Sequence, residues 1–510
     1  MSETRTGNSI RNITVALIGQ SVGIILQFIS RRVFVDSMPM DLLGINSVFA
    51  NILSMLSLAE LGIGSAITFS LYKPLAENDT HQITAIMNFY KWMYRMIAIV
   101  VTICGICFVP FLRIIIKDDI KNLTIYYFLY LSSTVISYLC AYKRTLIIAD
   151  QKGYISSIYR YSYIAILSII QIVVLLVFHS YVLYLVSQII LSFGENLLIT
   201  RKADQLYPYL NDTSVKLSDK DKKGYFKNIR AMLMHRIGSV IVTNTDSILL
   251  SALVNINAVS IYANYKLVFS GLSTIMSQLF SSVTASVGNL LQEKNTNHAY
   301  DMYKIIEIMT CWIYGVVSIC LMVLFNDFIG LWVGEQFIES QDYVFILIGV
   351  FFIYGIREPT NMFKNALGLF WNDRYKAVAE AIVNIVLSII MGKLWRERGI
   401  FGATIISAIM IPCWIEPYVL YKHHWKRKVS EYFALIGKQI GVLFFIGFVL
   451  TYGFSFIDVS SWIGFILKSA ICFVTANLLY VLSICRTNEF NQIVKIGRGF
   501  ATRCLAKSNR

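Results

Sequence analysis

Long apolar stretches, separated by short polar ones, follow each other along nearly the whole chain. One after another exceeds the roughly 20 residues that an α-helix needs to cross about 30 Å of hydrocarbon. The stretches are continuous, whereas strands of a membrane β-barrel alternate apolar and polar residues. The pattern therefore predicts an all-α integral membrane protein with about fourteen transmembrane helices. We expect these helices near residues 11–36, 41–72, 83–112, 122–147, 153–178, 181–201, 225–252, 257–292, 299–326, 342–367, 372–394, 399–421, 432–457 and 461–485.

A weak internal repeat predicts that these helices form two related lobes. SIRNITVALIGQ at 9–20 aligns with NIRAMLMHRIGS at 228–239, and Asn46 and Asn264 open corresponding helices. An even number of helices separates the copies, so the pseudo-symmetry axis would run along the membrane normal. The expected parts are an N-terminal lobe of six helices (1–201), a charged cytoplasmic linker (202–224), a C-terminal lobe of six helices (225–428), two extra helices (429–485) and a basic tail (486–510).

Composition and charge agree with this architecture and indicate its orientation. Of the 510 residues, 56% are hydrophobic and 15% are charged, and the net charge is +15. Basic residues gather at 201–230 and 422–428, while 326–342 contains no Lys or Arg. Cytoplasmic loops of membrane proteins are rich in Lys and Arg, so we expect both termini in the cytoplasm, although the segments 113–121 and 393–398 oppose this assignment. The positive charge then reflects inner loops and not nucleic-acid binding.

The two ends of the chain are polar or basic. A polar N-terminus leads into the first apolar run without a small-residue cleavage site, so we expect an uncleaved first helix. The tail from residue 486 is basic with periodic apolar positions. It is either an amphipathic helix on the anionic inner leaflet or a disordered basic segment.

Known catalytic and metal-binding patterns are absent from the sequence. Cys104 and Cys107 form a C-x-x-C, but no second pair or histidine set completes a zinc site. No phosphate-binding loop, G-x-S-x-G elbow or H-E-x-x-H occurs. The predicted outer loops are also too short for a catalytic domain. We therefore expect a transport protein that is not an enzyme, with no cofactor and no metal.

Polar residues recur on one face of several predicted helices, and these faces could surround a central cavity. Charges inside hydrocarbon are costly and usually face a cavity or a partner. The candidate cations for binding an anionic substrate are Arg31, Arg32, Arg236, Lys266 and Arg357. The candidates for coupling or for other cavity contacts are Asp246, Glu380, His235, Gln27, Asn384 and Glu60.

Structural interpretations of these residues stay open. Arg31 and Arg32 could extend to lipid headgroups, and Asp246 could only pair with a neighbouring cation. Arg357 could form a salt bridge with Glu358 at a kink made by Pro359.

Glu60 lies beside Gly62 and Gly64, which suggest a hinge or a close helix crossing. For Glu60 itself, an ion pair with Lys91 or Arg95 is favoured over a cavity position.

Five segments of the sequence carry a family resemblance. They are RRVFVDSMPMDLLGINSVFANILSMLSLAELGIGSAITFSLYKPLAEND (31–79), MNFYKWMYR (87–95), NIRAMLMHRIGSVIVTNTDSILLSALV (228–254), IYANYKLV (261–268) and GLFWNDRYKAVAEAIVNIVLSII (368–390). These segments keep their order and spacing, span nearly the whole chain, and resemble bacterial polysaccharide flippases, the polysaccharide-transporter branch of the multidrug/oligosaccharidyl-lipid/polysaccharide exporter superfamily.

The resemblance implies a bacterial cytoplasmic-membrane protein that works by alternating access. Its implied substrate is a polyprenyl-diphosphate-linked oligosaccharide, moved to the outer leaflet for capsule, exopolysaccharide or O-antigen-like polymer assembly. Guanidinium and ammonium groups suit such a diphosphate head, and the prenyl tail can stay among membrane lipids. The polysaccharide polymerase machinery is a further candidate partner.

Two rival functions are weighed against this one. A cation-coupled multidrug exporter of the same fold should carry acids in its cavity, because its typical substrates are cationic. A membrane polysaccharide polymerase should carry a large outer loop with catalytic groups. The sugar, the coupling ion and the oligomeric state are beyond the sequence.

Overall fold

The computed structural model describes residues 5–57, 60, 63–212, 214–291 and 296–495, and about 88% of it is helical. The described residues contain no β-strand. They divide into two compact units, Met1–Ala263 and Asn264–Arg510. The repeat in the sequence instead suggested a division at 202–224, and that lobe assignment stays a prediction.

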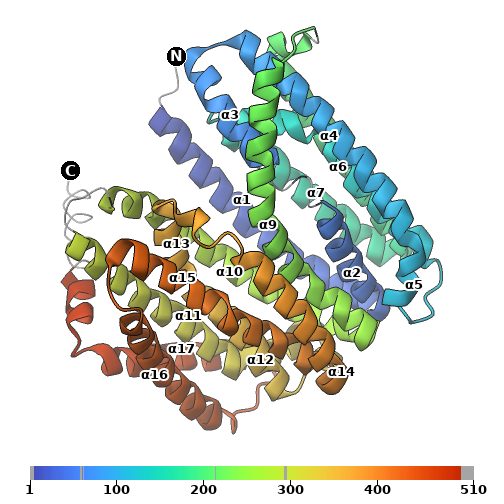
Figure 1. Cartoon of the computed structure of the whole chain (residues 1–510). Helices are drawn as coiled ribbons and strands as arrows, with labels where there is room; N and C mark the ends of the chain where they lie inside the picture. The colour runs from blue at the N-terminus through green and yellow to red at the C-terminus, as the bar shows by residue number, and fades with distance from the viewer. Residues whose placement is uncertain (1–4, 58–59, 61–62, 213, 292–295, 496–510) are drawn as a thin grey trace, which may run out of the picture. The chain divides into compact units, whose positions relative to one another are not determined.

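The first unit contains the helices from α1 to the start of α10 (Figure 1). Within it, α1 packs on α7, α6 packs on α4 and α8, and α9 packs on α2 and α3. Its elements are α1 (Arg5–Ser37), α2 (Met40–Leu56), α3 (Ile63–Glu77), α4 (Thr80–Phe108), η2 (Val109–Phe111), α5 (Leu112–Ile115), α6 (Leu123–Ala149), α7 (Gly153–Phe178), α8 (Tyr181–Leu206), η3 (Pro208–Asn211), α9 (Asp219–Leu253) and α10 (Ile256–Leu290).

One predicted helix of this unit, at 41–72, is interrupted between α2 and α3. Gly62 lies outside the described residues, so the expected hinge or close helix crossing stays a prediction. Asp79 then begins α4, because its side chain accepts a hydrogen bond from the backbone N–H of Gln82 at 2.9 Å.

The start of α10 lies directly against α2. A Cβ atom on Gly44 would come within 2.4 Å of the Ile256 carbonyl oxygen, so only glycine permits this approach. The Ser260 hydroxyl donates a hydrogen bond to the Met40 carbonyl at 2.5 Å. Asp118 accepts a hydrogen bond from the Ile256 backbone N–H at 3.1 Å.

The second unit is built around α11, which packs on α12, α13, α16 and α17. Its core includes the fully buried side chains Tyr303, Cys311, Phe363, Leu420 and Tyr480. Its elements after α10 are α11 (Thr296–Val333), η4 (Glu335–Phe337), α12 (Gln341–Ile356), α13 (Glu358–Ala366), η5 (Leu369–Trp371), α14 (Lys376–Met410), α15 (Pro412–Leu420), the π-helix η6 (Tyr421–Trp425), α16 (Ser430–Phe454) and α17 (Trp462–Ile484).

Two helix breaks position the polar side chains of the unit. Arg357 separates α12 from α13, and the next helix starts with Glu358 and Pro359. The long α14 contains a turn at Trp395–Arg396, where Arg396 has a φ of 53°. Its two halves lie antiparallel, because Asn384 of the first half donates hydrogen bonds to Thr404 and Ser407 of the second. These positions agree with the predicted helix limits at 394 and 399.

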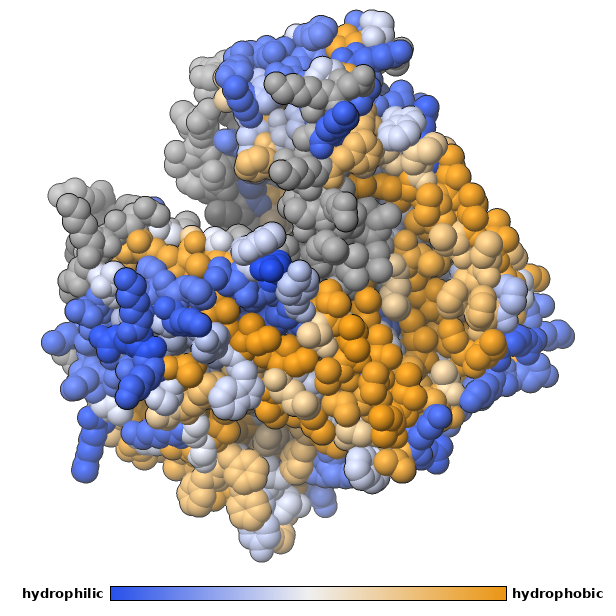
Figure 2. Space-filling model, in the orientation of Figure 1, coloured by the Kyte–Doolittle hydropathy of each residue, from blue (hydrophilic) through white to orange (hydrophobic). Residues whose placement is uncertain are grey.

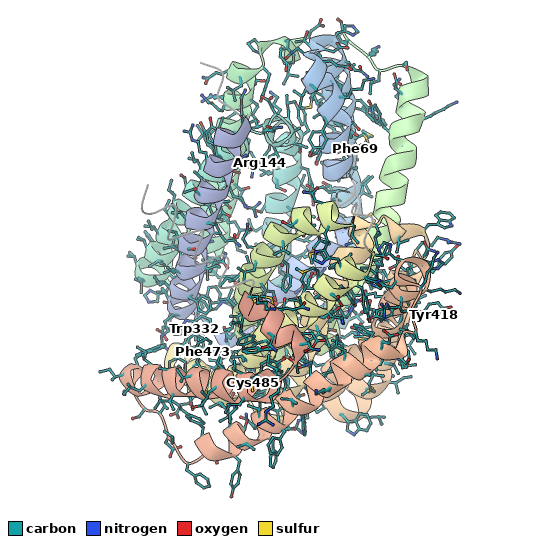
Figure 3. All side chains as sticks on the ribbon, turned by 90° about the vertical axis from the view of Figure 1, so that its left-hand side faces the viewer. Phe69, Arg144, Trp332, Tyr418, Phe473 and Cys485 are labelled. Atoms are coloured by element: carbon teal, nitrogen blue, oxygen red, sulfur yellow. The ribbon has the colours of Figure 1, made fainter. Side chains whose placement is uncertain are left out.

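The helix flanks are apolar enough for a lipid environment. Ten helices among the described residues could cross a membrane by length and composition, or eleven if the bent α6 is counted as one span. The expected total of about fourteen stays a prediction. Figure 2 shows apolar residues over the helix flanks of each unit and hydrophilic residues gathered at helix ends. Large apolar side chains are exposed on such flanks, among them Phe69 at 71% and Phe473 at 56% (Figure 3).

Candidate functional site

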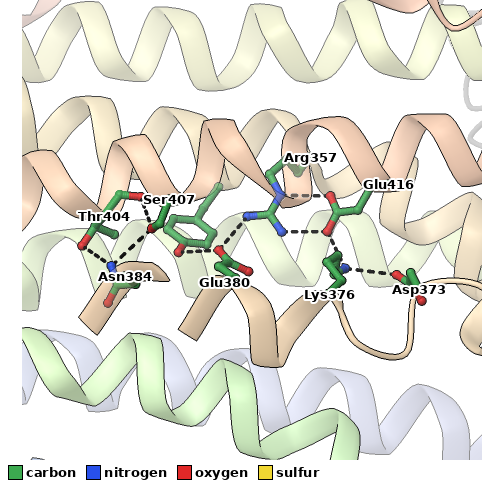
Figure 4. A network of polar contacts seen from close by, with 9 residues as sticks. Arg357, Asp373, Lys376, Glu380, Asn384, Thr404, Ser407 and Glu416 are labelled. Atoms are coloured by element: carbon green, nitrogen blue, oxygen red, sulfur yellow. Dashed lines mark hydrogen bonds and ion pairs between the residues drawn. The ribbon is translucent and has the colours of Figure 1, made fainter. Parts of the chain in front are cut away.

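A buried network of charged side chains surrounds Arg357 in the second unit (Figure 4). Its guanidinium group donates hydrogen bonds from Nε and Nη2 to the two carboxylate oxygens of Glu416, at 2.9 and 2.7 Å. This parallel geometry is the strongest arrangement of an arginine and a carboxylate. Glu380 lies 3.7 Å from Arg357 Nη1 and accepts a hydrogen bond from the Tyr354 hydroxyl at 3.1 Å.

Two lysines continue this network toward the loop between α13 and α14. Lys376 Nζ donates a hydrogen bond to Glu416 Oε1 at 2.6 Å and lies 3.3 Å from Asp373. Lys364 donates a hydrogen bond to the same Asp373 carboxylate. The network thus joins the helix break at Arg357, the start of α14 and helix α15, which contains Pro412 and Pro417.

The charges of this network balance among its described members. Three cations are in ion pairs with three carboxylates. The sequence predicts that Arg357 supplies positive charge to a substrate, and that role stays a prediction; the structure pairs Arg357 with Glu416 and not with its neighbour Glu358. It would therefore bind an anion only by exchanging partners. The cations are Arg357, Lys364 and Lys376, and the carboxylates are Asp373, Glu380 and Glu416.

Sequence reasoning found part of this network. It singled out Arg357, Glu380 and Asn384, and the structure places the first two together. It did not assign a role to Lys376, although this lysine lies one helical turn before Glu380 on the same face. It did not assign a role to Glu416 either. Asn384 is fully buried and joins the halves of α14 instead of entering the ion network.

Arg31 in the first unit has different surroundings. Its Nη1 atom is buried and has no hydrogen-bond partner in the part of the chain that the structure describes. Tyr130 and Tyr184 are its described electrostatic neighbours, and no carboxylate is among them. Tyr184 packs with Phe34 and Tyr181, with ring centroids 5.4 and 5.9 Å apart. Arg31 is thus a partly buried cation, with its Nη1 atom enclosed, beside an aromatic cluster.

The neighbouring candidates of α1 are placed differently from Arg31. Arg32 forms a half-exposed ion pair with Asp36, at 2.8 Å and one helical turn away. Exposed ion pairs of this kind contribute little to stability. Gln27 is exposed. Of the three, only Arg31 holds its charge inside the unit.

The remaining candidates lie on α9, α10 and the break after α2. Asp246 is buried near Tyr262, and Lys266 is half-buried. The side chains of His235 and Arg236 lie outside the described residues. Their predicted roles therefore stay predictions.

Glu60 does not form the expected ion pair with Lys91 or Arg95 among the described residues. Its carboxyl group instead faces Tyr138 and Tyr94. The reason is the rotation of α4, which turns Tyr94 inward and leaves the next residue, Arg95, exposed. The helix period limits which residues of α4 can reach Glu60.

Comparison with known proteins identifies the architecture. No protein-family model and no curated protein sequence matches the chain. A solved structure titled lipid II flippase MurJ, in an inward closed conformation, matches with a TM-score of 0.66 and 14% identity, covering 93% of this chain and 100% of that one. The fold is that of MOP superfamily transporters.

Two further structures share the MOP fold. The Vibrio cholerae MATE transporter VcmN matches with a TM-score of 0.56 and 12% identity, covering 83% of this chain and 99% of that one. A MOP superfamily transporter from Pyrococcus furiosus, whose title reports a binding pocket of reversed polarity, matches with a TM-score of 0.55 and 14% identity, covering 82% and 96%. The MOP fold and the apolar helices make this chain a multi-pass membrane protein. These neighbours are transporters and flippases, not enzymes.

Proposed function

We propose that this protein is a flippase for polyprenyl-diphosphate-linked oligosaccharide repeat units. It moves them from the inner to the outer leaflet by alternating access. The translocated repeat units are then used to assemble capsule, exopolysaccharide or O-antigen-like polymers. The MOP fold and the sequence resemblance to polysaccharide flippases support a transported substrate of this class. The membrane is then the bacterial cytoplasmic membrane, with both termini in the cytoplasm and the polymerase machinery as a partner.

The environment of Arg31 is the observation that carries the proposal. A buried guanidinium without a carboxylate is unfavourable, because the lost hydration is not replaced. A diphosphate headgroup would supply the missing negative charge and accept charge-assisted hydrogen bonds. A cationic drug would gain nothing from this position.

The other predicted cations contribute less than Arg31 to the proposed binding of the diphosphate. Arg32 and Lys266 add positive charge, and Arg236 belongs to the same set although its side chain is not described. Arg357 joins only if the diphosphate replaces Glu416 as its partner. Such an exchange would open the buried network during transport and close it afterwards.

Arg31→Gln tests the proposal in proteoliposomes that contain lipid-linked oligosaccharide from the host. A charge-assisted hydrogen bond contributes about 1.5–3 kcal/mol, so flipping should slow by about tenfold or more. Arg31→Lys keeps the charge and should retain part of the rate. The control is Arg398→Gln, at an exposed ion pair with Asp342.

Either of two results would refute the proposal. One is a wild-type protein that flips none of the lipid-linked oligosaccharide. The other is an Arg31→Gln variant, present at normal levels, that flips as fast as the wild type. In cells, deletion should make lipid-linked repeat units accumulate on the inner leaflet.

A multidrug exporter of the same fold is the second candidate. Buried carboxyl groups favour it, because Glu60 and Glu307 are in no ion pair among the described residues and could attract a cationic compound. Efflux of a fluorescent cation from proteoliposomes separates the two functions. The flippase proposal expects no efflux and the exporter expects no flipping.

A further inference from the structure

Glu307 of α11 is a buried acid to which the proposed transport gives no role. Its side chain is 0% exposed. The Thr360 hydroxyl donates a hydrogen bond to Glu307 Oε1 at 2.7 Å, and the Tyr303 hydroxyl lies 2.9 Å from the Thr360 hydroxyl. The other carboxyl oxygen, Oε2, has no hydrogen-bond partner among the described residues.

The described titratable groups near Glu307 come from its own helix and from α15, η6 and α16. Tyr303 and Cys311 belong to its own helix, and Glu416 approaches from α15. The remaining two are Tyr421 of η6 and Tyr432 of α16. None of these groups is a cation, and one of them is a carboxylate.

These surroundings disfavour a negative charge on Glu307. Burying a carboxylate without a cation is strongly unfavourable, whereas the neutral acid needs only hydrogen-bond partners. A metal ion does not fit, since the described residues contain no cluster of three or more His, Cys, Asp or Glu side chains that could hold one. The ligand that suits this position is a proton on Oε2.

A row of hydroxyl groups leads from Glu307 toward the surface of the second unit. Tyr303 stacks on Tyr300 with ring centroids 6.3 Å apart. The Tyr300 hydroxyl donates a hydrogen bond to Glu431 at 2.9 Å and lies 3.3 Å from the Tyr421 hydroxyl. The Glu431 side chain is 43% exposed. Tyrosine hydroxyl groups thus lie between Glu307 and a partly exposed carboxylate, with a ring contact and not a hydrogen bond between Tyr303 and Tyr300.

The position of Thr360 links Glu307 to the charged network. Thr360 lies on α13, one turn after Arg357, so the helix that hydrogen-bonds Glu307 also begins at the central cation. An ionised Glu307 would place a second negative charge near Glu416 and compete for Arg357. A protonated Glu307 leaves the pair of Arg357 and Glu416 undisturbed.

We propose that Glu307 is a proton-binding site, and that its loading and release switch the ion pairs around Arg357 during transport. One proton from water binds Oε2 and leaves again to water, so no other reactant is needed. The coupling to transport rests on the proposed function, whereas the proton site does not. Protonation holds the network closed, and deprotonation frees Arg357 to exchange its partner.

Infrared difference spectroscopy of the purified full-length protein tests the proton site without any substrate. The wild type should show the carbonyl band of a protonated carboxylic acid, which disappears as the pH rises. Glu307→Gln should remove this band, and Thr360→Val should move its midpoint by about one pH unit, because a hydrogen bond to the group is lost. Glu77→Gln, at an exposed surface position, is the control and should leave the band unchanged.

A band that survives in Glu307→Gln would overturn the proton site. If that variant does not fold, Glu307→Asp keeps a titrating group and should shift the midpoint of the band. An Asp variant with the wild-type midpoint would equally overturn the site.

Proteoliposomes with and without a pH gradient test the coupling. If the wild type flips lipid-linked oligosaccharide, the gradient should change its rate several-fold, and Glu307→Gln should flip at one rate under both conditions. Gradient dependence that persists in Glu307→Gln would overturn the coupling. A wild type that flips nothing would instead refute the proposed function, while the infrared result would stand by itself.

Discussion

Removal of the Glu416 carboxylate is the sharpest test of the buried network. Glu416 is 0% exposed and accepts hydrogen bonds from Arg357 at two oxygens and from Lys376 at one. Glu416→Leu leaves Arg357 without its main partner, while Lys376 keeps Asp373 at 3.3 Å. Glu380, at 3.7 Å from Arg357, is too distant to replace the two lost hydrogen bonds.

The expected loss follows from the burial of the pair. Breaking a buried ion pair by removing one partner costs about 3–5 kcal/mol, because the remaining charge stays desolvated. The double variant Arg357→Met with Glu416→Leu removes both charges. It should lose less stability than the sum of the single variants, with a coupling of about 0.5–3 kcal/mol.

Denaturant unfolding of the purified protein in detergent measures these differences. The exposed pair of Arg398 and Asp342 serves as control, and Arg398→Gln should change stability by at most about 1 kcal/mol. Single variants at Glu416 and Arg357 that stay within this range would refute the reasoning. Additive losses in the double variant would equally show that the two side chains do not act as a pair.

Two further predictions concern helix packing. Gly44→Leu should destabilise the first unit by about 1–3 kcal/mol, because its Cβ would lie 2.4 Å from the Ile256 carbonyl oxygen and 2.7 Å from the Ser260 hydroxyl; unfolding measurements that match the wild type would contradict this. Lys468→Met should weaken the packing of α17 on α11 by about 3 kcal/mol, because the buried ammonium donates a hydrogen bond to Asp327 at 2.8 Å. Proteolysis near the α16–α17 connection should become faster, and an unchanged rate would count against this ion pair.

The structure also revises how the polar stripes are understood. Helical spacing placed Glu380 and Asn384 on one face, and both are buried on α14. The same spacing did not reveal that Arg357 would bind Glu416, which is 59 residues away along the chain. Periodicity gives the buried face of a helix, but the partner on that face depends on which helix is packed against it.

The sequence by itself determined the class of this protein. Continuous apolar runs can satisfy their backbone hydrogen bonds in lipid only as helices, so the pattern predicted an all-helical membrane protein. The proline at 359 likewise marked a helix break, because proline lacks the N–H that continues a helix.

Only the tertiary structure decided which charges are balanced. Arg31 and Arg357 look alike in the sequence, since each is a basic residue at the end of an apolar run. The fold surrounds the first with tyrosines and gives the second a carboxylate from α15. Glu307 is a single acid within an apolar helix. Only the tertiary structure, which places residues of five different elements around Glu307, shows that no cation is among its described neighbours. Electrostatic interactions act across space, so helix packing, and not chain order, sets the state of each buried charge.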